Sequence, residues 1–169
     1  MDQIRDLGWL GVVGNTDEML FRPKPLQEFA SQSPKLQPLF AAIEEMAIAA
    51  REALGEARLA WLRALPLVQM QGPMALVHGS PDSPWRAPAH IHRAYIRSVS
   101  GMTVANTGSV SLSYDGDRRA AYILLDDFKP VIRPVEYDLE RELEALSGCR
   151  LPHADWVAKM LDSGCFQMP

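Results

Sequence analysis

The spacing of the apolar residues changes near Pro66, and this change limits the folds that the chain can adopt. Over residues 39–65 apolar residues recur at helical spacing, which predicts two helices separated by Gly55 and ended by Pro66. After Pro66 short apolar runs alternate with turn residues, as is typical of strands. The chain therefore combines a helical segment with a strand-rich segment.

The remaining segments complete an α/β or α+β layered pattern. Residues 21–38 hold four prolines and predict an irregular connection. Further helices are predicted over 139–146 and 152–161. The predicted strands are 7–13, 67–70, 74–78, 94–98, 103–105, 110–114, 120–125 and 131–135.

Composition narrows the class of protein. A length of 169 residues suits a single domain, 1–169, and 47% apolar with 22% charged residues is ordinary for a globular chain. The net charge of −4 argues against a nucleic-acid partner. No apolar run is long enough to cross a membrane, and the first residues lack the pattern of a signal peptide, so a cytoplasmic protein without a membrane partner is expected. Cys149 and Cys165 are predicted to be reduced structural thiols.

Three of the four histidines lie beside predicted strands. His78 precedes a Gly-Ser turn, and His90 and His92 form a His-x-His pair whose rings share one side of an extended segment. Asn15 lies in a Gly-Asn turn at another strand end. Imidazole nitrogens and an amide oxygen can bind Mn, Zn, Fe or Ni, so these four residues are candidate metal ligands, with simple turn residues as the alternative.

Four segments, in order along the chain, resemble the motifs of calcineurin-like metallophosphoesterases, most closely the bacterial small phosphodiesterase-like branch. The family motifs, in order, are Gly-Asn-His-Asp, His-Gly, Gly-His-Thr-His-Arg and an Asn-Pro-Gly-Ser-Val turn. The matching segments are Gly14-Asn15-Thr16-Asp17, Val77-His78-Gly79-Ser80-Pro81, Ala89-His90-Ile91-His92-Arg93 and Asn106-Thr107-Gly108-Ser109-Val110.

The resemblance implies a layered αββα sandwich and a centre of two divalent metal ions that activates a water molecule against a phosphate mono- or diester. It implies that Asn15, His78 and His90 bind the second metal and that His92 binds the first. The position of Arg93 implies packing or charge on the substrate side, with a solvated surface arginine as the alternative. Residues 36–65 would be a helical segment resembling a cap, and the partner would be a small phosphate ester.

The chain also differs from the family pattern. It contains no Asp-x-His motif, and neither this motif nor the Gly-Asp motif precedes Asn15, so the N-terminal metal-binding strands are expected to be missing. Thr16 replaces the histidine that protonates the leaving group in many members. Without the first strands, apolar sheet edges would be exposed, and self-association is expected to cover them.

Three functional hypotheses follow. The first is a metal-dependent phosphoesterase lineage whose N-terminal part is absent from the sequence. The second is a non-catalytic relative that acts as a binding or interaction module. The third is a site for one metal ion built from Asn15, His78 and His90, with or without His92.

Overall fold

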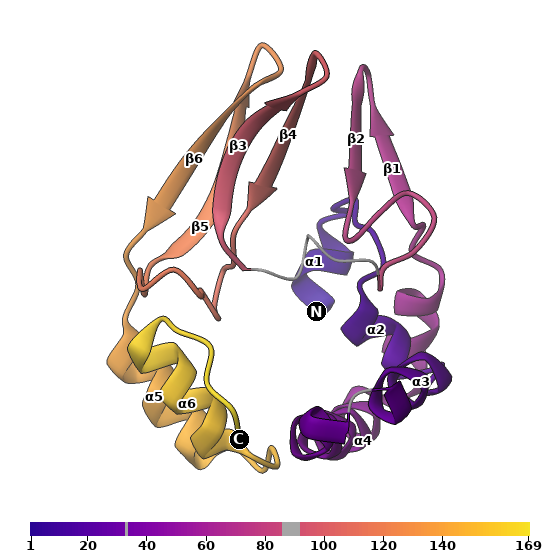
Figure 1. The fold of residues 1–169 in the computed structure, drawn as a ribbon, viewed down its shortest axis with the longest axis vertical. Helices are drawn as coiled ribbons and strands as arrows, with labels where there is room; N and C mark the ends of the chain where they lie inside the picture. The colour runs from indigo at the N-terminus through magenta and orange to yellow at the C-terminus, as the bar shows by residue number, and fades with distance from the viewer. Residues whose placement is uncertain (33, 86–91) are drawn as a thin grey trace. The chain divides into compact units, whose positions relative to one another are not determined.

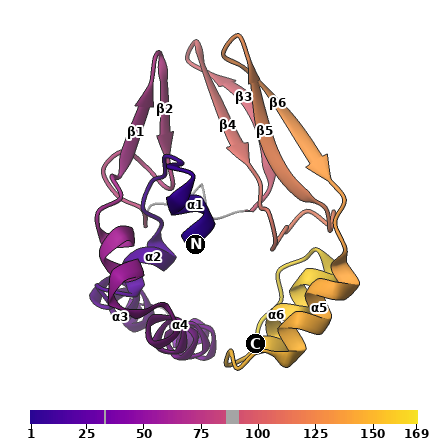
Figure 2. The same cartoon turned by 180° about the vertical axis from the view of Figure 1, so that it is seen from behind.

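The computed structural model describes residues 1–32, 34–85 and 92–169 and divides the chain into two compact units. Unit 1 comprises Met1–Pro88 and unit 2 comprises Ala89–Pro169. Unit 1 carries four α-helices and one hairpin, and unit 2 carries two hairpins followed by two helices (Figures 1 and 2). Each unit is described here by itself.

Helix α4, Gln37–Arg63, is the long element of unit 1 and confirms the helical periodicity of the sequence. Gly55 interrupts it with φ 73° and ψ 165°, so the chain forms two successive helices, as predicted. The second helix buries Leu59 and Leu62 against Leu20, and these three residues form a buried cluster within the core of the unit. The fold of unit 1 therefore depends on the C-terminal part of α4.

The short helices of unit 1 pack on α4. Helix α2 spans Asn15–Met19, α3 spans Lys24–Gln32, and the 3-10 turn η1 spans Pro34–Leu36. All three contact α4, and η1 leads directly into it. Helix α1, Asp2–Asp6, is joined to α4 by a hydrogen bond from Arg58 Nε to Asp2 Oδ1 of 2.9 Å.

Two predictions for unit 1 were wrong. Residues 7–13 form no strand, because their backbone has no partner ladder in the described part of the chain and only Val13 N–H bonds across, to Pro66 C=O at 2.9 Å. The connection 21–38 is largely helical rather than irregular. Its prolines lie before or in the first turns of α3, η1 and α4, where a missing N–H costs no helical hydrogen bond.

The strand predictions around residue 72 were correct. Strand β1, Val68–Gln71, pairs antiparallel with β2, Met74–Val77, in a register that sets Val68 opposite Val77. Gly72 takes φ 56° in the turn between them. Strand β2 ends directly before His78, so the hairpin determines the position of this histidine.

Unit 2 is built on two antiparallel hairpins. Strands β3, Ala94–Val99, and β4, Met102–Thr107, form the first, and β5, Ala120–Asp126, and β6, Lys129–Val135, form the second. The hairpins lie against each other, with β3 beside β6 and β4 beside β5. In both two-residue turns each central residue has positive φ, as type I′ turns require.

The strand predicted over 110–114 does not form in the structure. Gly108 takes φ 77°, and its N–H bonds to Asn106 Oδ1 at 2.9 Å, so the chain turns out of β4 as the motif predicted. Beyond it, local bonds replace a strand ladder: Ser111 N–H donates to Ser109 Oγ, and Ser113 Oγ–H donates to Asp115 Oδ1.

Two helices complete unit 2, as the sequence predicted. Helix α5, Leu139–Gly148, is capped by Asp138, whose Oδ1 accepts the backbone N–H of Arg141 at 3.0 Å. Helix α6, Ala154–Ser163, packs beside α5, and both views show the pair side by side (Figures 1 and 2). The buried face of α6 carries Trp156, Met160 and Leu161.

No helix in the described ranges is long and apolar enough to cross a membrane.

The loop before β5 contains an ion pair with a testable pH dependence. Side-chain hydrogen bonds from Arg119, followed by its backbone N–H, lower the pKa of Asp117 to about 2 from its ordinary 3.8. Because the folded-state pKa is depressed, the pair stabilises the protein above the unfolded value, and this contribution is lost as the pH falls from about 4 to about 2. The pair is exposed to solvent, so the effect is less than about 1 kcal/mol.

We expect an NMR titration of the Asp117 carboxyl to give a midpoint near 2. Asp117→Asn should lower the free energy of unfolding at pH 6 and change it little at pH 2. Asp127→Asn, at an exposed position of the β5–β6 turn, is the control. A normal titration midpoint at Asp117 would contradict the ion pair.

Candidate metal centre and an adjoining pocket

Asn15 and His78 meet in unit 1, although 62 residues separate them in the chain. Asn15 is the first residue of α2, and His78 directly follows β2. The distance from His78 Nε2 to Asn15 Oδ1 is 3.0 Å, and the pair is partly buried. The sequence predicted both residues at the site, and the structure brings them together.

Gly14 allows this approach. A Cβ on Gly14 would lie 3.2 Å from both Nδ1 and Cε1 of His78, closer than ordinary van der Waals contact. The N–H of Gly14 also donates to Asp17 Oδ2 at 2.8 Å, which fixes the start of α2. The Gly-Asn-Thr-Asp motif therefore combines a glycine that leaves room for the imidazole with an aspartate that holds the turn.

The spacing of the pair fits a shared metal ion. Two ligand atoms at about 2.1 Å from an ion and at right angles to each other lie about 3 Å apart. Asn15 Oδ1 and His78 Nε2 have this separation, and an amide oxygen and an imidazole nitrogen are both ligands of first-row transition metals. In the ion-free geometry His78 Nε2–H donates to the amide oxygen, so ion binding requires loss of this proton.

Helix α2 also positions Trp85, a residue that the sequence patterns did not indicate. The indole Nε1–H of Trp85 donates to Glu18 Oε2 at 2.6 Å, and Glu18 pairs with Arg22 at 3.3 Å. These residues line a cavity of about 410 Å³ within unit 1, together with Phe21 and Arg63. Arg63 lies over the ring of Phe21, 5.5 Å from its centroid.

His92 lies in unit 2, two residues before β3, and its ring has partners on two sides. Its backbone is left-handed, with φ 47°, a conformation that histidine adopts more often than most residues. Nδ1 lies 2.6 Å from Leu112 C=O, and because a carbonyl only accepts, Nδ1 carries the proton. The ring stacks on Tyr114 with centroids 4.5 Å apart. This leaves Nε2 as the ring nitrogen that does not face the carbonyl, and metal-binding histidines commonly donate their other ring N–H in this way.

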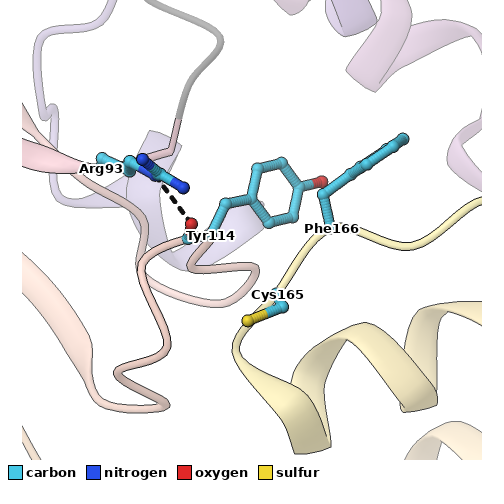
Figure 3. Close-up of a pocket in the computed structure, with 4 residues that line it drawn as sticks. All are labelled: Arg93, Tyr114, Cys165 and Phe166. Carbon is cyan, nitrogen blue, oxygen red and sulfur yellow. Dashed lines mark hydrogen bonds between the residues drawn. The ribbon is translucent and has the colours of Figure 1, made fainter.

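Arg93 follows His92 and borders a pocket of about 400 Å³ in unit 2. Arg93 Nε–H donates to Tyr114 C=O at 2.8 Å, which fixes the guanidinium plane. Cys165 and Phe166 form the remaining wall, and Figure 3 shows the four side chains around this space. The pocket thus places one cation beside two aromatic rings.

The predicted ligands therefore have different outcomes. Asn15 and His78 come together in unit 1, His92 is oriented in unit 2, and His90 lies outside the described residues. Within 1–32, 34–85 and 92–169 there is no group of three His, Cys, Asp or Glu side chains that could hold a metal ion. The assignment of the four ligands remains a prediction.

Sequence reasoning missed Tyr114 and Phe166. It placed Tyr114 in a strand, and it gave no role to Phe166, which follows the last helix. Cys165 was predicted to be a structural thiol, yet both cysteines are free and exposed. No local pattern joins Tyr114 to Phe166, and their meeting depends both on the loop that follows Gly108 and on the way the chain leaves α6.

Two solved structures share this fold. A crystal structure of a metallophosphoesterase from Sphaerobacter thermophilus matches 96% of this chain and 80% of its own, with 21% identity and a TM-score of 0.68. A hypothetical protein from Pyrococcus horikoshii matches 98% of this chain and 79% of its own, with 20% identity and a TM-score of 0.71. At these identities the similarity establishes the fold, and it confirms the predicted α/β fold of the metallophosphoesterase type. No protein-family model and no curated protein sequence matches the chain.

Proposed function

We propose that this protein is a metal-dependent phosphoesterase that hydrolyses a phosphate mono- or diester. The observation that carries the proposal is the meeting of Asn15 and His78 at 3.0 Å, in a chain that shares the fold of a metallophosphoesterase. Asn15, His78, His90 and His92 would hold divalent transition metal, with Mn, Zn, Fe and Ni as candidates. Bound metal would supply Lewis acidity, which lowers the pKa of a coordinated water and offsets the charge of the phosphoryl oxygens.

The side chains of this protein would contribute orientation and charge. Gly14 leaves room for the His78 ring beside Asn15, and Leu112 C=O orients the His92 ring through Nδ1, which leaves Nε2 to bind metal. Arg93 would bind an anionic oxygen of the substrate with the guanidinium nitrogens that do not face Tyr114. Thr16 replaces the histidine that the family resemblance implies as a general acid, so water or the substrate would protonate the leaving group.

The purified chain tests this proposal directly. Bis(p-nitrophenyl) phosphate and p-nitrophenyl phosphate are incubated with the protein after EDTA treatment and then with Mn²⁺, Zn²⁺, Fe²⁺ or Ni²⁺. We expect release of p-nitrophenol only with added metal, and the preferred reporter distinguishes a diesterase from a monoesterase. Absence of hydrolysis with every metal would contradict the proposal and favour a non-catalytic binding module.

A further inference from the structure

The pocket beside His92 has an exposed aromatic wall that is held in place. Phe166 is 47% exposed although it lies in a chain segment fixed on both sides. Before it, Gly164 C=O accepts the N–H of Gly116 at 2.9 Å. After it, Gln167 C=O accepts the indole N–H of Trp156 at 2.9 Å. A large apolar ring that is exposed yet anchored is preorganised to contact a ligand.

The second ring of the pocket extends this wall. Tyr114 contacts Phe166 edge to face, with centroids 5.6 Å apart and an interplanar angle of 75°. The ring of Tyr114 also stacks on the ring of His92, one of the candidate metal ligands. The rings of His92, Tyr114 and Phe166 therefore form a continuous series from the candidate ligand to the pocket wall. The T-shaped contact leaves a face of Phe166 for a further planar ring.

The cation of the pocket is also positioned. Arg93 Nε is bound to Tyr114 C=O, and the terminal guanidinium nitrogens form no hydrogen bond or ion pair with any residue in the described ranges. A guanidinium presents paired donors to phosphate oxygens. The pocket thus combines a site for an anion with a surface for a planar ring, and its volume of about 400 Å³ lies within the range of small-molecule sites.

We propose that this pocket binds the aromatic part of the substrate, so that the protein acts on phosphate esters that carry a planar aromatic or heteroaromatic group. Arg93 contacts the phosphate, and the ring of the ligand stacks on Phe166. Figure 3 shows both of these side chains at the pocket. The assignment of this ligand as a substrate rests on the phosphoesterase activity proposed above. The binding itself does not require metal, so it can be tested separately.

Cys165 provides a direct reporter of occupancy. Its thiol is exposed and lines the pocket, whereas Cys149 is exposed at the end of α5 and is not among the residues that line it. Trypsin releases the two cysteines in different peptides, 142–150 and 160–169. The rate of iodoacetamide alkylation of each thiol can therefore be followed in the same sample by mass spectrometry, with Cys149 as the internal control.

The probes separate the ring from the phosphate. In EDTA, adenosine monophosphate and p-nitrophenyl phosphate are compared with ribose 5-phosphate, which lacks an aromatic ring. We expect the aromatic phosphates to slow alkylation of Cys165 and to leave Cys149 unchanged. Protection by adenosine monophosphate alone identifies a nucleobase-sized ring, and protection by p-nitrophenyl phosphate alone identifies a small aryl ring. Equal protection by ribose 5-phosphate, or no protection by either aromatic phosphate, overturns the proposal.

Two variants test the assigned roles. Phe166→Leu should weaken binding of the protecting ligand about fivefold or more, because a ring stacked on an aromatic side chain is lost. Arg93→Gln should weaken it about tenfold. Phe128→Leu and Arg133→Gln are matched controls at exposed positions of the β5–β6 hairpin in the same unit. Equal effects in the Phe166 variant and its control would overturn the stacking role.

The two proposals fail in different ways. If no phosphate ester is hydrolysed while an aromatic phosphate still protects Cys165, the proposed activity is wrong and the pocket is retained as a ligand site. If hydrolysis occurs but bis(p-nitrophenyl) phosphate is hydrolysed no faster than an alkyl phosphodiester, the assignment of the pocket to the substrate is overturned.

Discussion

His78→Ala should lose most of its bound transition metal and at least about a hundredfold of its metal-dependent hydrolysis rate. The imidazole supplies one of the two proposed ligand atoms that lie 3.0 Å apart, and alanine offers no replacement. Even changes to residues that only orient a metal ligand cost about 10- to 100-fold in affinity or activity, so loss of a ligand should cost at least as much. Metal is measured by elemental analysis of the purified protein, and hydrolysis with the chromogenic phosphate esters.

A histidine outside the candidate centre serves as the matched control. His153 caps α6 with a left-handed backbone, and His153→Asn preserves that conformation because asparagine adopts it readily. We expect this variant to keep its metal and its rate. Urea denaturation of both variants shows whether the fold survives. Unchanged metal content in a folded His78→Ala protein would contradict the assignment of His78 as a ligand.

The sequence predicted well those parts of the fold that depend on local patterns. The periodicity over 39–65 gave the two helices of α4, and Gly55 takes the positive φ that separates them. The hairpin turns at Gly72 and at Ser100–Gly101 also formed, because their residues accept positive φ. In each case the interaction that determines the local structure lies within a few residues of the sequence pattern that predicted it.

The predictions failed where another physical effect decided the outcome. Residues 7–13 are apolar enough for a strand, but a strand needs a partner, and Val13 makes one backbone bond, to Pro66. Helix α3 contains Pro25 in its first turn, where proline is tolerated, so the number of prolines was misleading. Residues 110–114 follow the turn at Gly108 and form side-chain hydrogen bonds instead of a ladder.

The candidate site likewise contains residues that the sequence indicated and residues that it did not. Asn15 and His78 were indicated by short motifs and lie in contact in the structure, while their role as metal ligands stays a prediction. Tyr114 and Phe166 carry no motif, and their contact arises from the way the chain leaves α6. Sequence patterns therefore indicated the candidate ligands, while the pocket beside His92 required the three-dimensional structure.

The exit from α6 depends on Gly164, and Gly164→Ala should be strongly destabilising. Gly164 has φ 63°, where a Cβ costs about 1–2 kcal/mol. That Cβ would also lie 3.0 Å from the carbonyl carbon of Gly116 and 3.3 Å from the backbone N of Asp117. Backbone atoms cannot rotate away as a flexible side chain can, so overpacking adds about 1–3 kcal/mol. We expect a total loss of about 2–5 kcal/mol in the free energy of unfolding of unit 2.

Gly101→Ala separates the conformational cost of a Cβ at positive φ from the cost of overpacking. Gly101 has φ 79°, but nothing lies within 4 Å of its added Cβ, so this variant has the conformational cost alone. Urea denaturation gives the loss in each variant, and hydrogen exchange of the Gly116 amide reports its bond to Gly164 C=O. We expect faster exchange at Gly116 in Gly164→Ala only, and weaker ligand protection of Cys165, because Cys165 and Phe166 follow the displaced residue. Equal destabilisation by the two variants would show that the contact with Gly116 does not hold the pocket wall in place.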